Sequence, residues 1–175
     1  NKIKCNKDLK DKKIKDIVYT PIQVSKDCIY YTLPFIDPSD ILLEPFSGRD
    51  SFYNEFPKIN KKDWCEIDRG RDFLDYKDNV DWCITNPPYS TFKIWIEKMM
   101  EISNKGFCLL VNNLTITPPR LTYINSKGFY VSLIYLFKIS SWFGNQFYWI
   151  FQKREDKKNN LEMFTKRIEY KIDKK

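Results

Sequence analysis

The sequence predicts an α/β domain with a mostly parallel sheet that ends in an antiparallel hairpin. Short apolar runs alternate with longer mixed segments along most of the chain, which is typical of buried parallel strands joined by helices. Two later runs rich in aromatic and β-branched residues, 130–139 and 146–151, flank a turn that contains Gly144-Asn145 and indicate the hairpin. At 175 residues, 42% of them hydrophobic, the chain is large enough to bury one core.

Four apolar runs are expected to form the parallel strands. They span residues 41–44, 64–67, 82–85 and 107–111. Between the last two runs, residues 91–102 have apolar side chains at helical spacing, so we expect an amphipathic helix there. Its apolar face consists of Phe92, Trp95, Ile96 and Met99. Thr20 and Thr117 each precede a proline, which predicts two further helix starts with threonine as the cap and proline in the first turn.

The two ends of the chain are more charged than its middle. Residues 1–15 have few apolar anchors and are expected to form a mobile segment before a folded domain over 16–153. Residues 154–175 form a basic tail, in which four apolar residues at helical spacing predict a short helix. These are Leu161, Phe164, Ile168 and Ile172. Because the apolar stretches are too short to span a bilayer, we expect no membrane partner.

The formal net charge is +7 and the pI is about 9.0. This balance suits a polyanionic partner, because Lys and Arg contacts to phosphates release counterions. A coding bias towards Lys, Asn, Ile and Tyr in an AT-rich genome explains the same composition equally well.

The five cysteines show no Cys-x-x-Cys spacing, and the sequence contains no histidine. Scattered cysteines favour buried thiols in a reducing compartment, either the cytoplasm or, for a viral protein, the nucleic-acid compartment of a host cell. The absence of histidine excludes Ser-His and Cys-His hydrolases and removes the commonest zinc ligand, so we expect no metal site.

The clearest chemical signal is Asn86-Pro87-Pro88-Tyr89, directly after the predicted strand 82–85. Two prolines at this point stop the hydrogen-bond ladder and stiffen the loop that leaves the strand. In open α/β sheets, ligands bind at the carboxyl edge of the strands. The sequence therefore places an amide, a stiff backbone and a stacking ring at a ligand-binding edge. The alternative is an ordinary surface turn, because these residue types are common in turns.

This loop resembles the Asp/Asn-Pro-Pro-Tyr/Phe/Trp hallmark of the amino-methyltransferases that use S-adenosylmethionine and act on exocyclic amines of nucleic-acid bases. The resemblance extends over residues 19–153 and implies a Rossmann-like class I methyltransferase fold. Residues 43–52 resemble the cofactor loop after the first strand, and residues 65–68 resemble the acidic end of the second strand. Residues 72–74 resemble the adenine-binding element, and residues 19–21 resemble the N-terminal cofactor motif.

The resemblance implies catalytic roles for the four residues of the loop, Asn86, Pro87, Pro88 and Tyr89. It implies cofactor contacts for a larger set: Tyr19, Thr20, Pro21, Glu44, Phe46, Gly48, Asp50, Glu66, Ile67, Asp72, Phe73 and Asn86.

The implied cofactor contacts have physical reasons. A tight turn at Gly48 lets backbone N–H groups approach the methionine part of S-adenosylmethionine. Glu66, at the end of a strand, can accept both hydroxyls of the ribose. Asp72 can accept from the amino group of the cofactor's adenine, while the backbone N–H of Phe73 donates to the ring.

The implied reaction needs no general base. The side-chain oxygen of Asn86 and the carbonyl of Pro87 bind the two hydrogens of the target amine, so that its nitrogen can pyramidalise and attack the methyl group of the sulfonium in line. The surplus proton leaves after methylation, so the absence of histidine is compatible with this chemistry. Tyr89 stacks on the target base, which must be flipped out or single-stranded.

Two positions depart from the family pattern. The cofactor loop normally reads Phe-x-Gly-x-Gly, and Asp50 replaces the second glycine, where a side chain is expected to crowd the cofactor. Glu66 and Asp72 are too close for the helix that usually separates the two motifs. A compact turn through residues 68–70 must replace it, and the strand beyond is expected to be short or missing. This arrangement resembles small DNA adenine methyltransferases of phages and mobile elements.

The expected substrate is N6 of adenine in DNA, and the expected partner is nucleic acid. No segment is long enough for a target-recognition domain, so recognition falls to loops, to a second copy in a homodimer or to a partner subunit. Phosphate contacts are expected from the basic residues Arg49, Lys58, Lys61, Lys62 and Arg120. The alternatives are methylation of an RNA base amine, N5-methylation of a protein glutamine, and a catalytically silent nucleic-acid-binding subunit of the same fold.

Overall fold

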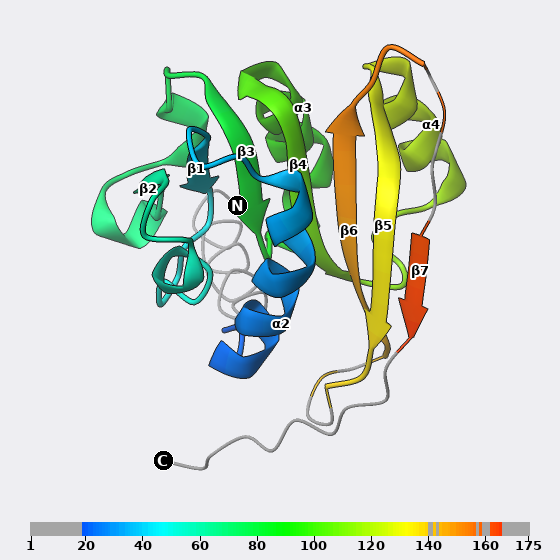
Figure 1. The fold of residues 1–175 in the computed structure, drawn as a ribbon, viewed down its shortest axis with the longest axis horizontal. Coiled ribbons are helices and arrows are strands. Elements are labelled where there is room, and N and C mark those ends of the chain that lie inside the picture. The colour runs from blue at the N-terminus through cyan, green and yellow to red at the C-terminus, as the bar shows by residue number, and fades with distance from the viewer. Residues whose placement is uncertain (1–18, 140–141, 143, 157, 159–161, 166–175) are drawn as a thin grey trace, which may run out of the picture.

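The strands of the computed structural model, which describes residues 19–139, 142, 144–156, 158 and 162–165, form one mixed sheet (Figure 1). The strand order is β2-β1-β3-β4-β6-β5-β7. The strands are β1 (Ile41–Glu44), β2 (Lys61–Trp64), β3 (Val80–Thr85), β4 (Ser103–Asn112), β5 (Phe129–Phe137), β6 (Gln146–Lys153) and β7 (Glu162–Thr165). Strands β1 to β4 run parallel to one another, and β6 pairs antiparallel with both β4 and β5. The predicted fold class, a mostly parallel sheet with an antiparallel hairpin, is therefore confirmed.

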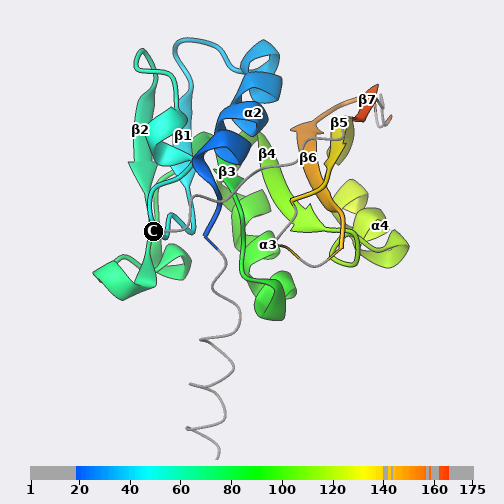
Figure 2. The ribbon, with the colours of Figure 1, turned by 90° about the horizontal axis from the view of Figure 1, so that it is seen from below.

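Helices cover both faces of the sheet. Figure 2 shows α2 (Ile22–Thr32) on one side, and α3 (Phe92–Ile102) and α4 (Pro118–Ser126) on the other. Neighbouring strand residues face opposite layers, since Leu42 packs in the same buried cluster as Val24 of α2 whereas Leu43 packs in the cluster of α3 and α4. Burial on both faces explains why these strands are continuous apolar runs.

The start of α2 differs from the predicted helix start. Pro21 occupies the N-cap position, no side-chain hydrogen bond caps the helix, and Ile22 is its first residue. Thr20 therefore does not cap the helix, and its side chain makes a different contact, described below. At the other end of α2, the hydroxyl oxygens of Thr32 and Tyr148 lie 2.7 Å apart, so a buried hydrogen bond holds the helix to β6. The predicted helix start after Thr117 is confirmed: Thr117 occupies the N-cap position of α4 and Pro118 is its first residue, although no side-chain hydrogen bond caps this helix either.

Two elements lie elsewhere than predicted. Strand β2 covers Lys61–Trp64 and not 64–67, because an edge strand with half-exposed side chains does not need an apolar run. Phe164, which was expected in a helix, belongs to strand β7, which pairs parallel with β5. Most of the other tail positions, and the predicted mobile segment 1–15, lie outside the described residues.

The connection from β2 to β3 is short, as expected. All of residues 65–79 are described, and they contain neither an α-helix nor a further strand. Two 3₁₀ turns take their place, η3 (Ile67–Arg69) and η4 (Phe73–Asp75). Gly70 ends η3 in the left-handed region at φ 75°, which reverses the chain so that Glu66 and Arg71 form a β-bridge. This reversal brings the acidic strand end close to the segment that begins at Asp72.

Candidate functional site

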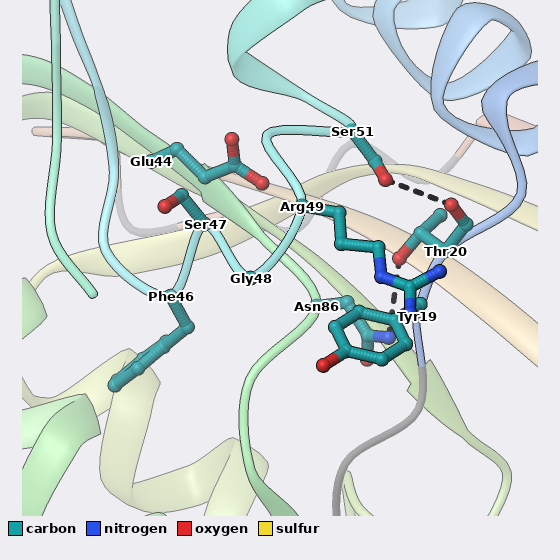
Figure 3. Close-up of a pocket in the computed structure, with 9 residues that line it drawn as sticks. All are labelled: Tyr19, Thr20, Glu44, Phe46, Ser47, Gly48, Arg49, Ser51 and Asn86. Carbon is teal, nitrogen blue, oxygen red and sulfur yellow. Dashed lines mark hydrogen bonds between the residues drawn. The ribbon is translucent and has the colours of Figure 1, made fainter. Parts of the chain in front are cut away.

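Four segments meet at the carboxyl edge of the parallel strands. They are the segment before α2, the loop after β1, the turns after β2 and the loop after β3. A small pocket of about 30 Å³ lies among the segment before α2, the loop after β1 and the loop after β3 (Figure 3). Its lining consists of Tyr19, Thr20, Glu44, Phe46, Ser47, Gly48, Arg49, Ser51 and Asn86. Six of these nine residues were predicted as cofactor contacts, namely Tyr19, Thr20, Glu44, Phe46, Gly48 and Asn86.

Glu44 fixes both ends of the loop after β1. It is the last residue of β1 and only 2% exposed, and its carboxyl oxygens accept hydrogen bonds from the backbone N–H groups of Phe52 (3.3 Å) and Tyr53 (2.6 Å). Burial raises the pKa of Glu44 to about 8, although the two N–H donors act in the opposite direction. The loop 45–51 is therefore closed over a carboxyl group that holds its proton at neutral pH.

Gly48 connects this loop to the turn after β2. Its φ of 51° lies in the left-handed region, and a Cβ built there would lie 3.5 Å from the Tyr19 ring. Its backbone N–H donates to Oε2 of Glu66 at 2.6 Å. The other oxygen of Glu66 accepts from the N–H of Asp68 at 3.3 Å. Glu66 thus lies beside the loop after β1, and its carboxylate is engaged by backbone N–H groups of Gly48 and Asp68.

Asp50 adopts a conformation that glycine usually supplies. Its φ of 61° is the one positive value among the described residues other than glycine. The carboxylate turns to Arg69 and accepts from both terminal guanidinium nitrogens, at 2.5 and 3.0 Å. Asp50 is not among the described residues that line the pocket. The side chain expected to crowd the cofactor is therefore paired with Arg69, a residue for which the sequence pattern gave no signal.

Asp72 and Phe73 form the start of η4. One oxygen of Asp72 accepts from the backbone N–H of Leu74 at 2.9 Å and so caps the turn. Phe73 is 2% exposed, and its ring packs edge-on against that of Phe46, with centroids 5.3 Å apart. Ile67, by contrast, is 55% exposed. In the segment that resembles the adenine-binding element, Phe73 therefore packs in the core and Asp72 caps a turn, whereas Ile67, from the segment that resembles the acidic strand end, lies at the surface.

Thr20 joins the N-terminal segment to two loops. Its hydroxyl oxygen accepts from Nδ2 of Asn86 at 3.2 Å, and its carbonyl accepts from the hydroxyl of Ser51 at 2.8 Å. Figure 3 shows both hydrogen bonds, with the ring of Tyr19 and the side chain of Arg49 side by side next to them. The Arg49 guanidinium lies 4.0 Å from the Tyr19 ring centroid, a cation–π contact.

The loop after β3 is held by the helix that follows it. Pro87 is buried, and the carbonyl of Pro88 accepts from the indole N–H of Trp95 at 2.9 Å. The helical pattern predicted Trp95 as a core residue, and the structure adds this hydrogen bond to its packing. Tyr89 opens η5 (Tyr89–Thr91) and packs, half buried, against the core cluster of α3. The backbone of the predicted catalytic loop is thus fixed from within the domain.

The basic residues expected at phosphates do not gather at one place. Lys61 and Lys62 begin β2, at the amino end of the parallel strands and away from the pocket. Arg120 donates to the carbonyl of Thr115 at 2.7 Å and lies over the ring of Phe92, 4.2 Å from its centroid. Of this basic group, Arg49 is the member that lines the pocket.

Within the described residues, no group of three or more Cys, Asp or Glu side chains is arranged to hold a metal ion. None of the described helices is long and apolar enough to cross a membrane.

The sequence matches no protein-family model, and no curated protein is significantly similar to it. Solved structures, however, share its fold. A candidate RNA methyltransferase from Pyrococcus horikoshii aligns with a TM-score of 0.60 and 15% identity over 77% of this chain and 85% of its own. Magnesium protoporphyrin IX methyltransferase from Synechocystis PCC 6803, solved with bound S-adenosylmethionine, aligns with a TM-score of 0.61 and 8% identity over 76% and 79%. The modification subunit of a candidate type I restriction enzyme from Vibrio vulnificus aligns with a TM-score of 0.62 and 14% identity over 91% and 49%.

At these identities the likeness concerns the fold. The chain has the Rossmann-like fold of class I S-adenosylmethionine-dependent methyltransferases, and its candidate site lies at the carboxyl edge of the parallel strands.

Proposed function

We propose that the protein transfers a methyl group from S-adenosylmethionine to the exocyclic N6 amine of adenine in DNA. The observation that carries the proposal is the hydrogen bond of Asn86 to Thr20. It joins the loop that resembles the catalytic motif to the segment that resembles the N-terminal cofactor motif, and both residues line one pocket together with Gly48. Three segments that resemble separate parts of one methyltransferase site therefore lie together in space.

The polar groups around the pocket fit S-adenosylmethionine in kind. Gly48 leaves the pocket lining free of a side chain at that position. Outside the lining, Glu66 and Asp72 carry acceptors of the kinds suited to ribose hydroxyls and to an amino group, and in this structure both accept from backbone N–H groups. The pocket is open to solvent, and its volume of about 30 Å³ is far below the roughly 300–1,000 Å³ of pockets that bury whole ligands. Bound S-adenosylmethionine would therefore extend beyond this pocket, whose lining includes Tyr19, 45% exposed and in contact with Arg49.

The bound cofactor supplies an electrophilic methyl group on a cationic sulfur, and the residues of the chain position the target amine in front of it. The amide of Asn86 is oriented by its Nδ2–H donation to Thr20, which favours directing Oδ1 to a hydrogen of the target amine. The Pro87 carbonyl accepts the second hydrogen, and the neighbouring Pro88 carbonyl is fixed by Trp95. The lone pair of the amine then localises on nitrogen, and the surplus proton leaves to solvent after transfer. No side chain needs to change its protonation state.

The test is methyl transfer from labelled S-adenosylmethionine to separate pools of DNA, RNA and protein, with mass identification of the modified product. We expect N6-methyladenine in DNA. Asn86→Ala should abolish transfer while the affinity for S-adenosylmethionine, measured by calorimetry, changes little. Methylated RNA or glutamine would replace the proposed substrate. Unchanged turnover in Asn86→Ala would refute the mechanism, and a folded chain that binds no cofactor would favour a silent nucleic-acid-binding subunit.

A further inference from the structure

The ion pair of Asp50 and Arg69 joins the two loops that, under the proposed function, hold the cofactor. Both terminal nitrogens of the Arg69 guanidinium bind the Asp50 carboxylate, and one of them also donates to the hydroxyl of Ser47. This bidentate geometry is more directional than a single lysine contact. One arginine thus holds two points of the loop after β1 from the turn after β2.

Asp50 has a left-handed backbone conformation that glycine would adopt more easily, and its side chain forms the ion pair with Arg69. The residue closes a tight turn in which its N–H donates to the Ser47 carbonyl at 2.7 Å. Glycine would adopt this conformation without strain. For aspartate the conformation costs a free energy of the same order as the stabilisation that a half-exposed ion pair provides. The two side chains are 36% and 29% exposed, so the pair adds little net stability. Its main effect is therefore on the position of the loop.

Arg69 is itself firmly anchored. Its guanidinium lies 3.9 Å from the ring centroid of Trp64, the last residue of β2, and the hydrogen bond to Asp50 raises the pKa of Arg69. Next to this ion pair, the backbone N–H of Gly48 donates to Glu66, the N-cap residue of η3. The two links run side by side between the same loops, so the ion pair restrains the distance between Gly48 and Glu66.

We propose that Asp50 and Arg69 form a clasp that takes over the role of the helix and strand missing between β2 and β3, and that holds Gly48 and Glu66 in position for the cofactor. Both are positioning residues. The inference rests on the proposed function, because it names the residues that set the geometry of that same cofactor site.

The clasp can be tested by measuring S-adenosylmethionine affinity by calorimetry in Asp50→Asn, Arg69→Gln and the double variant. Asparagine tolerates the left-handed conformation, so Asp50→Asn removes the charge without changing the backbone preference. Each single variant should bind about 5- to 10-fold more weakly, a size typical of coupling between contacting residues. The double variant should be no weaker than the weaker single variant, because the two changes break one interaction.

The chain offers a matched control on the same tryptophan. Arg71 also lies over Trp64, 4.4 Å from its centroid, and pairs with Asp63 at 2.7 Å. Asp63→Asn breaks an equivalent Arg–Asp pair that does not touch the loop after β1, so its affinity should stay within about twofold of wild type. Additive losses in the double variant, equal losses in the control, or unchanged affinity in Asp50→Asn would each overturn the clasp. Tighter binding in Asp50→Asn would show that Asp50 competes with the cofactor for Arg69.

A second measurement does not depend on the cofactor. Amide hydrogen exchange of the ligand-free protein should show faster exchange at the Gly48 N–H in Asp50→Asn, and no change there in Asp63→Asn. If the wild-type chain binds no S-adenosylmethionine, the proposed function fails, and exchange still decides whether the clasp holds the loop. Unchanged exchange at Gly48 in Asp50→Asn would overturn the clasp independently.

Discussion

Replacing Glu44 with glutamine tests whether one buried carboxyl group makes the stability of this domain depend on pH. Glu44 is 2% exposed at the end of β1, and Phe52 and Tyr53 donate their N–H groups to it. Burial raises the pKa of this group from its usual 4.5 to about 8 in the folded protein. In the unfolded chain the group is solvated and ionises at its usual pKa.

The direction of the effect follows from this difference. Because the folded-state pKa of Glu44 is raised, the folded protein holds the proton more tightly than the unfolded chain does. The resulting stability is fully present below about pH 4.5 and is lost as the pH rises through about 8. At 1.36 kcal/mol per pH unit, the loss over this window is about 5 kcal/mol as an upper bound.

The assay is urea unfolding of wild type and Glu44→Gln between about pH 5 and about pH 9. At the acidic end the variant should be less stable, because the amide NH₂ of glutamine would face one of the two backbone N–H donors and could not accept from it. Towards the alkaline end the wild type should lose its advantage, so that the difference in unfolding free energy changes by roughly 3–5 kcal/mol. Glu101→Gln, at an exposed position of α3, serves as the control and should show a constant difference. A constant difference for Glu44→Gln as well would refute the reasoning.

Three further predictions concern the loop after β3. Tyr89→Ala should raise KM for nucleic acid about 10-fold or more, because base stacking on an aromatic ring contributes about 1–3 kcal/mol per base; Tyr89→Phe should be nearly normal, and an equal loss in both would argue against stacking. Trp95→Phe removes the donor to the Pro88 carbonyl at 2.9 Å and should lower kcat about 2- to 10-fold at nearly unchanged cofactor affinity, since a net hydrogen bond is worth about 0.5–1.5 kcal/mol. Thr20→Val removes the acceptor for Asn86 and should also lower kcat, whereas Thr20→Ser keeps the acceptor and should keep kcat close to that of the wild type. Equal kcat values for the valine and serine variants in steady-state kinetics would contradict the role of this hydrogen bond.

The fold was predictable where local pattern and burial agree. The strand ending at Glu44 and the strand ending at Thr85 are apolar runs because helices cover both faces, so hydrophobicity alone located them. Strand β2 begins with Lys61 and Lys62 at the sheet edge, where one side faces solvent, and the apolar pattern therefore placed it three residues late. Strand β7 could not be inferred because its pairing with β5 is a long-range contact that overrides the helical spacing around Phe164.

The candidate site was predictable as a set of loops but not as a set of contacts. Parallel strands bring their carboxyl ends to one edge, so Gly48, Glu66 and Asn86 were expected to be neighbours. Arg69 gave no signal because nothing in its sequence neighbourhood shows that it reaches Asp50, nineteen positions earlier. The partner of Asp50 is hidden for the same reason, since its position in the cofactor-loop pattern does not show that its carboxylate turns to Arg69.

The proposed chemistry and the buried carboxyl group together determine where pH sensitivity should arise. An amide, a proline carbonyl and a stacking ring do not titrate near neutrality, so the transfer step itself should be insensitive to pH there. Glu44 changes its charge near pH 8 and holds both ends of the cofactor loop through Phe52 and Tyr53. A loss of activity on the alkaline side should therefore appear in cofactor affinity and stability before it appears in kcat. A conventional general base is active only when deprotonated and would instead lower kcat on the acidic side, so the pH profile separates positioning from acid–base catalysis at this site.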